Sequence, residues 1–83
     1  MTTRLFVQTM FEKDHNVVIQ HTSTPNGMWD YKHEVKLRVT DQDGEVVVDV
    51  VRYHTFSLRK HFAQECEQWE QEVVDAAILE MIG

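Results

Sequence analysis

Apolar residues recur every three or four positions over the C-terminal third of the chain, as they do in an amphipathic helix. The recurring set is Leu58, Phe62, Cys66, Trp69, Val73 and Ala76. At about 100° per residue, these side chains form one stripe along a helix. Ser57 is suited to cap the first turn and Gly83 to end the last one. The spacing therefore predicts one long helix over residues 57–82.

The last turns of this predicted helix carry a second apolar stripe. Val74, Ile78 and Met81 lie about 100° around the helix from the first stripe, and Ile82 widens the second one. A small sheet would leave the end of so long a helix uncovered. Two interpretations follow: a wide core face closed by loops, or a symmetric dimer interface made by these four residues.

Two segments before the helix are rich in residues that favour strands, and they predict a hairpin. They are RLFVQTMFE at 4–12 and NVVIQHT at 16–22, separated by a polar break. One face of this hairpin would carry Leu5, Val7, Phe11, Val17 and Ile19.

A second predicted hairpin follows, and its first strand alternates between apolar and polar residues. In HEVKLRVT (33–40) the inward residues are Val35, Leu37 and Val39, and the turn DQDG leads into a returning strand over 45–55. Equal side-chain parity across the turn would place Val46, Val48 and Val50 beside Val39, Leu37 and Val35, with Lys36 near Asp49.

The predicted order is thus β-β-β-β-α in a single domain over residues 1–83. This is an α+β fold, in which a four-stranded antiparallel sheet has one face covered by the long C-terminal helix. The other face would be more apolar than water favours, which points to a partner. Its apolar candidates are Phe6, Met10, Val18, Val47, Val51 and Tyr53.

The connection between the hairpins contains the strongest turn signal, Ser23-Thr24-Pro25-Asn26-Gly27, followed by two aromatic residues, Trp29 and Tyr31. Such aromatic residues either fold back over the core or stay exposed as anchors for a protein partner.

The charge is acidic and unevenly placed. The formal net charge is −6, which argues against direct binding to nucleic acid. No Lys or Arg follows His61, whereas the predicted helix carries Glu65, Glu67, Glu70, Glu72 and Asp75. These acids form either a solvated surface or a face that binds a basic partner.

Basic residues gather where the last strand meets the helix: Arg52, His54, Arg59, Lys60 and His61. They are either solvated charges or, with the free N–H groups of a helix start, a site for a small anion or nucleotide.

The chain contains no recognisable metal, cofactor or catalytic motif. There are five histidines, but no HExxH or CxxC spacing, and His61 with Glu65 supplies only two ligands. His21 and His33 are expected at strand ends on the rim of the sheet, and Cys66 as a small buried apolar residue. We therefore expect no metal, no cofactor and no enzymatic activity.

The N-terminus is followed by no apolar run long enough for a signal peptide or a membrane span. We therefore expect a cytoplasmic protein that does not associate with membranes.

These patterns predict a small, acidic, non-catalytic protein-binding module that forms a homodimer. In size and charge the chain resembles inhibitors encoded by phages and mobile elements, including anti-CRISPR proteins, and this resemblance implies a partner with a basic surface. Two alternatives stay open: a small-anion or nucleotide sensor that uses the basic junction, and a structural subunit of a larger assembly.

Overall fold

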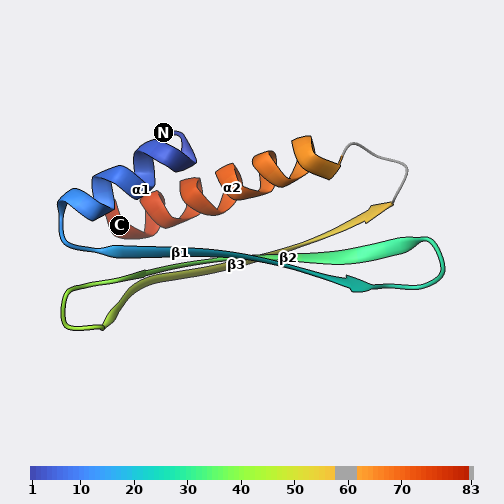
Figure 1. Cartoon of the computed structure of the whole chain (residues 1–83), viewed down its shortest axis with the longest axis horizontal. Helices are drawn as coiled ribbons and strands as arrows, with labels where there is room; N and C mark the ends of the chain where they lie inside the picture. The colour runs from blue at the N-terminus through green and yellow to red at the C-terminus, as the bar shows by residue number, and fades with distance from the viewer. Residues whose placement is uncertain (58–61, 83) are drawn as a thin grey trace.

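A computed structural model describes residues 1–57 and 62–82, and its elements follow the order α-β-β-β-α (Figure 1). The elements are α1 (Thr3–Glu12), β1 (Asn16–Pro25), β2 (Asp30–Thr40), β3 (Val46–Ser57) and α2 (Phe62–Ile82). The three strands form one antiparallel sheet in the order β1-β2-β3. The predicted α+β class, antiparallel sheet and C-terminal helix are confirmed.

The prediction of four strands is wrong, because residues 4–12 fold as helix α1. The Thr2 side chain caps this helix by accepting a hydrogen bond from the Leu5 N–H at 3.2 Å. Phe6 and Met10, four residues apart, share the buried side of the helix, whereas Phe11 is 75% exposed. The apolar residues of this segment fit the spacing of a helix and that of a strand. The segment folds as a helix, and Phe6 and Met10 are its buried residues.

The long helix begins later than predicted. Ser57 is the last residue of β3 and not a helix cap, and α2 begins at Phe62. Leu58 and Gly83, which belonged to the predicted helix and its end, lie outside the described residues. Trp69 and Val73 from the predicted stripe are buried in the core, as that stripe requires.

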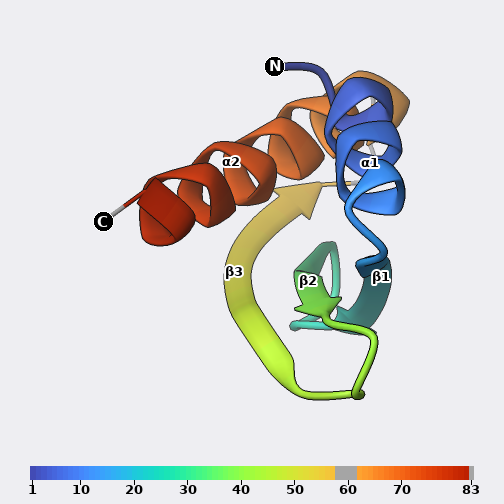
Figure 2. The ribbon, with the colours of Figure 1, turned by 90° about the vertical axis from the view of Figure 1, so that its left-hand side faces the viewer.

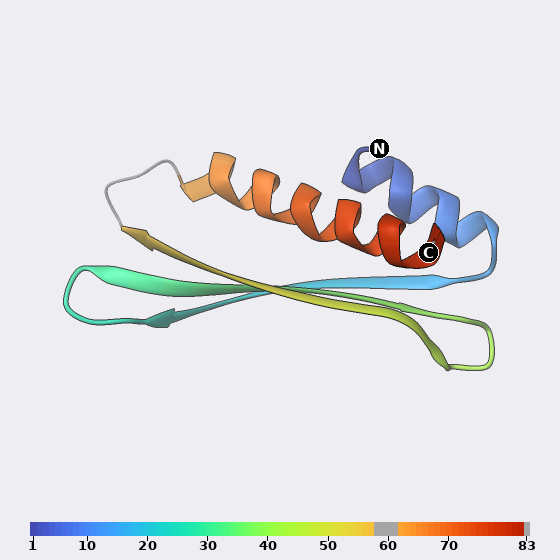
Figure 3. The ribbon, with the colours of Figure 1, turned by 180° about the vertical axis from the view of Figure 1, so that it is seen from behind.

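Both helices cover the same face of the sheet and lie side by side (Figures 2 and 3). Helix α1 packs over β1 and beside α2, while α2 packs over β2 and β3. The core between these layers consists of Phe6, Met10, Val35, Leu37, Val39, Val48, Val50, Phe56, Trp69, Val73, Val74 and Ala77. Helix α1 therefore covers part of α2 that the predicted sheet alone would have left exposed.

The register between β2 and β3 differs from the prediction by two residues. Val39 pairs with Val48 and Leu37 pairs with Val50. One residue of the difference arises at the turn, where Thr40 pairs with the exposed Val46, and a bulge between Val39 and Thr40 adds the other. Asp49 consequently lies beside Arg38, with Nη2 and Oδ2 3.2 Å apart, and not beside Lys36. The inward positions of Val48 and Val50 are as predicted.

The open face of the sheet is more polar than predicted, since Phe6 and Met10 lie in the core. Val18, Val47 and Tyr53 remain exposed on the strands. The cations of this face have partners within it, such as Lys32, whose Nζ lies 4.6 Å from the centre of the Tyr53 ring.

Candidate functional site

The acidic residues of α2 fall into two groups. Glu70 and Glu72 contact the strands: Glu70 Oε1 lies 2.6 Å from His21 Nε2, and Glu72 Oε1 lies 3.8 Å from Arg52 Nε. Glu67 and Asp75 are exposed, and the described part of the chain gives neither an ion-pair partner. Within the described residues of α2, the acids left to form a binding surface are Glu67, Asp75, the half-buried Glu65 and the exposed Glu80 near the end of the helix.

The two aromatic residues of the connection have different positions. Trp29 lies in the hairpin tip (residues 26–29) and is 69% exposed, next to Met28, which is 86% exposed. Tyr31 instead stacks on Phe56, with ring centres 5.5 Å apart, and so packs against the core. Trp29 is therefore available to a partner, while Tyr31 supports the base of the hairpin.

The basic junction is partly neutralised within the chain. Arg52 pairs with Glu72, and His54 Nε2 lies 3.0 Å from Glu72 Oε2, although these two atoms are not aligned for a hydrogen bond. Arg59, Lys60 and His61 lie outside the described residues. The two described members of the predicted anion site thus already face a carboxylate.

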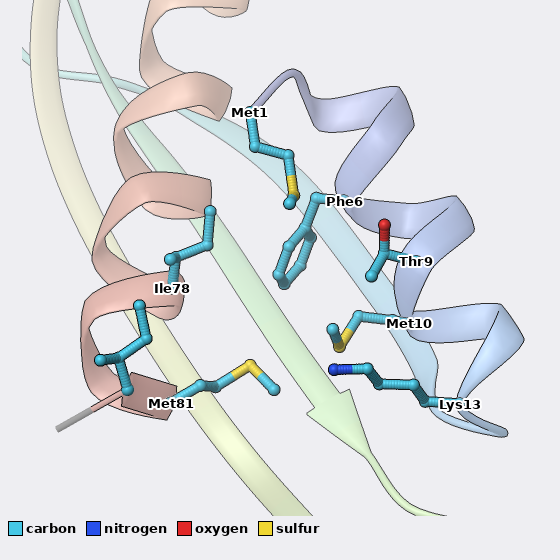
Figure 4. A pocket seen from close by; sticks show the side chains of 8 residues that line it. Met1, Phe6, Thr9, Met10, Lys13, Ile78 and Met81 are labelled. Atoms are coloured by element: carbon cyan, nitrogen blue, oxygen red, sulfur yellow. The ribbon is translucent and has the colours of Figure 1, made fainter.

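Three of the four residues predicted for a dimer interface line an apolar groove between α1 and the end of α2 (Figure 4). The groove has a volume of about 250 Å³, and Ile78, Met81 and Ile82 form one side of it. Val74 is fully buried within the chain, whereas Ile82 is 78% exposed. Of the four residues, Met81 and Ile82 offer the most surface to a second subunit.

The least expected feature is a chain of polar side chains beneath α2, which we call the relay: Ser23, His33, His21 and Glu70. His33 is 2% exposed and lies in the core, not at the rim of the sheet. Its Nδ1 is 2.6 Å from Ser23 Oγ and its Nε2 is 2.7 Å from His21 Nδ1. His21 Nε2 is in turn 2.6 Å from Glu70 Oε1.

With both rings neutral, only one set of protons satisfies the relay. The ionised Glu70 carboxylate can only accept, so His21 donates through Nε2–H and accepts at Nδ1. His33 then donates through Nε2–H and accepts at Nδ1 from the Ser23 hydroxyl. Each polar group at the centre of the site therefore has a partner, although His33 is buried.

Aromatic packing holds the relay between sheet and helix. The Trp69 ring centre lies 4.9 Å from that of His33 and 4.8 Å from that of His54, with which it stacks. Burial lowers the pKa of His33, and the neighbouring His21 and His54 lower it further. The environment thus favours a neutral, uncharged His33.

Cys66 lies against the same cluster from α2. One ligand atom from each of His21, His33 and Cys66 falls within 4.8 Å of the others. Burial raises the pKa of the Cys66 thiol, and the nearby Glu70 and Glu65 raise it further. The thiol is therefore protonated in the metal-free protein at neutral pH.

The site supports two kinds of chemistry. The relay is a carboxylate–imidazole–imidazole–hydroxyl chain, along which a proton can move between the Ser23 hydroxyl and Glu70 through His33 and His21. The two imidazoles and the thiol can also act as nitrogen and sulfur ligands. Neither was predictable from the sequence, because His21, His33 and Cys66 come from three elements and share no short motif.

Comparisons of the chain with protein-family models, curated proteins and solved structures found no match. Neither α1 nor α2, within the residues described, combines the length and apolar character needed to cross a membrane.

Proposed function

We propose that this chain is a non-catalytic protein-binding module whose binding surface combines the hairpin tip with the exposed acids of α2. The observation that carries the proposal is Trp29, which stands exposed at the end of two long paired strands. An exposed Trp beside an exposed Met is unfavourable in water, and Trp is the residue type most enriched at the centre of protein interfaces.

The charge of the chain supports a basic partner. Glu67 and Asp75 lie at the surface of α2, and the whole chain has a formal net charge of −6. Such a surface accelerates association with a positively charged protein, and added salt weakens this effect. A nucleic-acid-binding protein with a basic channel is the class of partner that suits it, as for inhibitors of the anti-CRISPR type.

We also propose that the module is a homodimer, joined through the groove side of α2. Met81 and Ile82 are exposed apolar residues at its C-terminal end, and both line the groove, in which Figure 4 labels Met81. The same residues would serve a structural subunit of a larger assembly, in which case the acids of α2 would not be needed.

Affinity capture with matched variants tests the binding role. A tagged chain is incubated with lysate of its host cells, and the captured protein is compared among wild type, Trp29→Ala, Glu67→Lys and the control Asp43→Lys. Asp43 lies in the β2–β3 turn, in the opposite connection of the sheet from Trp29. All four chains should have similar melting temperatures, because each replaced side chain is exposed.

The proposal predicts that wild type and the control capture the same basic protein. Trp29→Ala should lose about 30-fold in affinity or more, as hot-spot truncations of about 2 kcal/mol or more do. Glu67→Lys and added salt should also weaken capture. Equal capture by all four chains would refute the proposed surface.

A further inference from the structure

The three candidate ligands His21, His33 and Cys66 come from three different elements, β1, β2 and α2. The ligand atoms already lie within 4.8 Å of one another, with His33 buried and Cys66 half-buried. Such a cluster can join the helix to the sheet if a metal ion enters it.

The outer ring nitrogen of each histidine has a side-chain partner that can accept a hydrogen bond. His21 Nε2 bonds to Glu70, and His33 Nδ1 bonds to Ser23. Metal-binding histidines usually donate their second N–H to a carboxylate or another acceptor, which fixes the ring. The two nitrogens that remain, His21 Nδ1 and His33 Nε2, face each other at 2.7 Å.

We propose that His21, His33 and Cys66 bind a zinc ion that links α2 to β1 and β2. Two imidazoles and a thiolate are ligands that zinc prefers, whereas magnesium and calcium prefer oxygen. Three protein ligands leave the fourth tetrahedral position to water. This role is independent of the proposed binding of a protein partner.

The geometry needs only small side-chain movements. Tetrahedral zinc places two nitrogen ligands about 3.3 Å apart and a nitrogen and a sulfur about 3.6 Å apart. The facing nitrogens, now 2.7 Å apart, must therefore separate by about 0.6 Å. The Cys66 sulfur lies within 4.8 Å of the ligand atoms of both histidines. To reach a separation of about 3.6 Å, it must approach each of them by at most about 1.2 Å.

Zinc binding also requires a defined change in protons. The proton on His33 Nε2 moves to Nδ1, from where it is donated to Ser23 Oγ, and His21 keeps its Nε2–H bond to Glu70. Cys66 loses its thiol proton to solvent. One proton is released for each zinc bound to the neutral cluster.

Cobalt titration of the metal-stripped full chain is the direct test. Bound Co²⁺ should give the visible spectrum of a tetrahedral site and a near-ultraviolet charge-transfer band from the Cys66 thiolate. One equivalent of zinc should displace it, and zinc should raise the melting temperature.

Variants assign the ligands. Cys66→Ala should abolish the charge-transfer band, and His21→Asn should weaken cobalt binding more than about 100-fold, beyond the about 10–100-fold expected for Glu70→Gln. The control His15→Asn, which lies between α1 and β1, should bind as wild type does. Circular dichroism verifies that each variant is folded; should His21→Asn unfold, the Cys66→Ala spectrum alone decides.

Two results would overturn the zinc site. One is a wild-type chain that shows neither the tetrahedral cobalt spectrum nor a rise in melting temperature with zinc. The other is equal cobalt affinity and an identical spectrum for wild type and Cys66→Ala, which would place the metal among other side chains.

Discussion

At the residue scale, His33 shows what strand alternation can and cannot predict. Val35, Leu37 and Val39 were correctly predicted to face the core, and the same alternation continued by two residues places His33 there too. Its partners could not be predicted in this way. His21 and Ser23 reach His33 only through the β1–β2 register, and Cys66 only through the packing of α2.

The lowered pKa of His33 predicts that metal-free protein loses stability in acid. Below the ordinary value of 6.5, the unfolded chain binds a proton at this residue that the folded chain does not. This contribution to stability is thus complete above pH 6.5 and falls as the pH drops towards the lowered pKa. Urea unfolding in EDTA, between about pH 8 and about pH 5, measures it.

Two variants isolate this effect from the titration of carboxylates. His33→Gln should show a flatter dependence of the unfolding free energy on pH, whereas His15→Asn should keep the wild-type slope. Identical slopes for wild type and His33→Gln would contradict the neutral, buried state of His33.

At the element scale, residues 4–12 show why composition misled the prediction. Phe, Val and Thr favour strands, but strand propensity depends on the surface against which a segment packs. Here the helix buries Phe6 and Met10 and leaves Leu5, Val7 and Phe11 exposed, the reverse of the predicted strand, and Thr2 caps the first turn. The helix depends on its contact with α2, which lies about 60 residues further along the chain.

Two phenylalanines on α1 test its helical packing. Phe6→Ala should lower the free energy of unfolding by about 3–5 kcal/mol, because Phe6 is only 1% exposed. The control Phe11→Ala should change it by less than about 0.5 kcal/mol. Chemical denaturation measures both, and a larger loss for Phe11→Ala would favour the hairpin strand that the sequence suggested.

The bulge after Val39 makes a second prediction at this scale. Val48→Thr buries a hydroxyl group and should cost about 1–3 kcal/mol, whereas Val46→Thr, at an exposed position, should cost less than about 0.5 kcal/mol. Thermal unfolding of the two variants compares them directly. Similar losses would support the unbulged register, in which both valines face inward.

At the scale of the whole molecule, helices cover one face of the sheet and the other face is open (Figure 1). Lys32 and Arg38 lie on the open face with partners of their own, while Glu67 and Asp75 lie on α2. The uneven charge was predictable from the sequence. The contacts of Glu70 with His21 and of Glu72 with Arg52 were not predictable, because they depend on where α2 crosses the strands.

The apolar end of α2 predicts the state of association. Wild type should have the mass of a dimer by light scattering across a dilution series, and Ile82→Glu should be a monomer, because a buried charge opposes the interface. Leu5→Glu, an exposed position on α1, should remain a dimer. A wild-type chain that is monomeric at every concentration would contradict the proposed homodimer.

Hydrogen exchange on the complex with the captured partner tests the proposed binding surface most directly. We expect slower amide exchange on binding in the hairpin tip, residues 26–29, and in α2 around Glu67. Protection confined to the open face of the sheet around Lys36 and Arg38, with an unchanged hairpin tip, would contradict it.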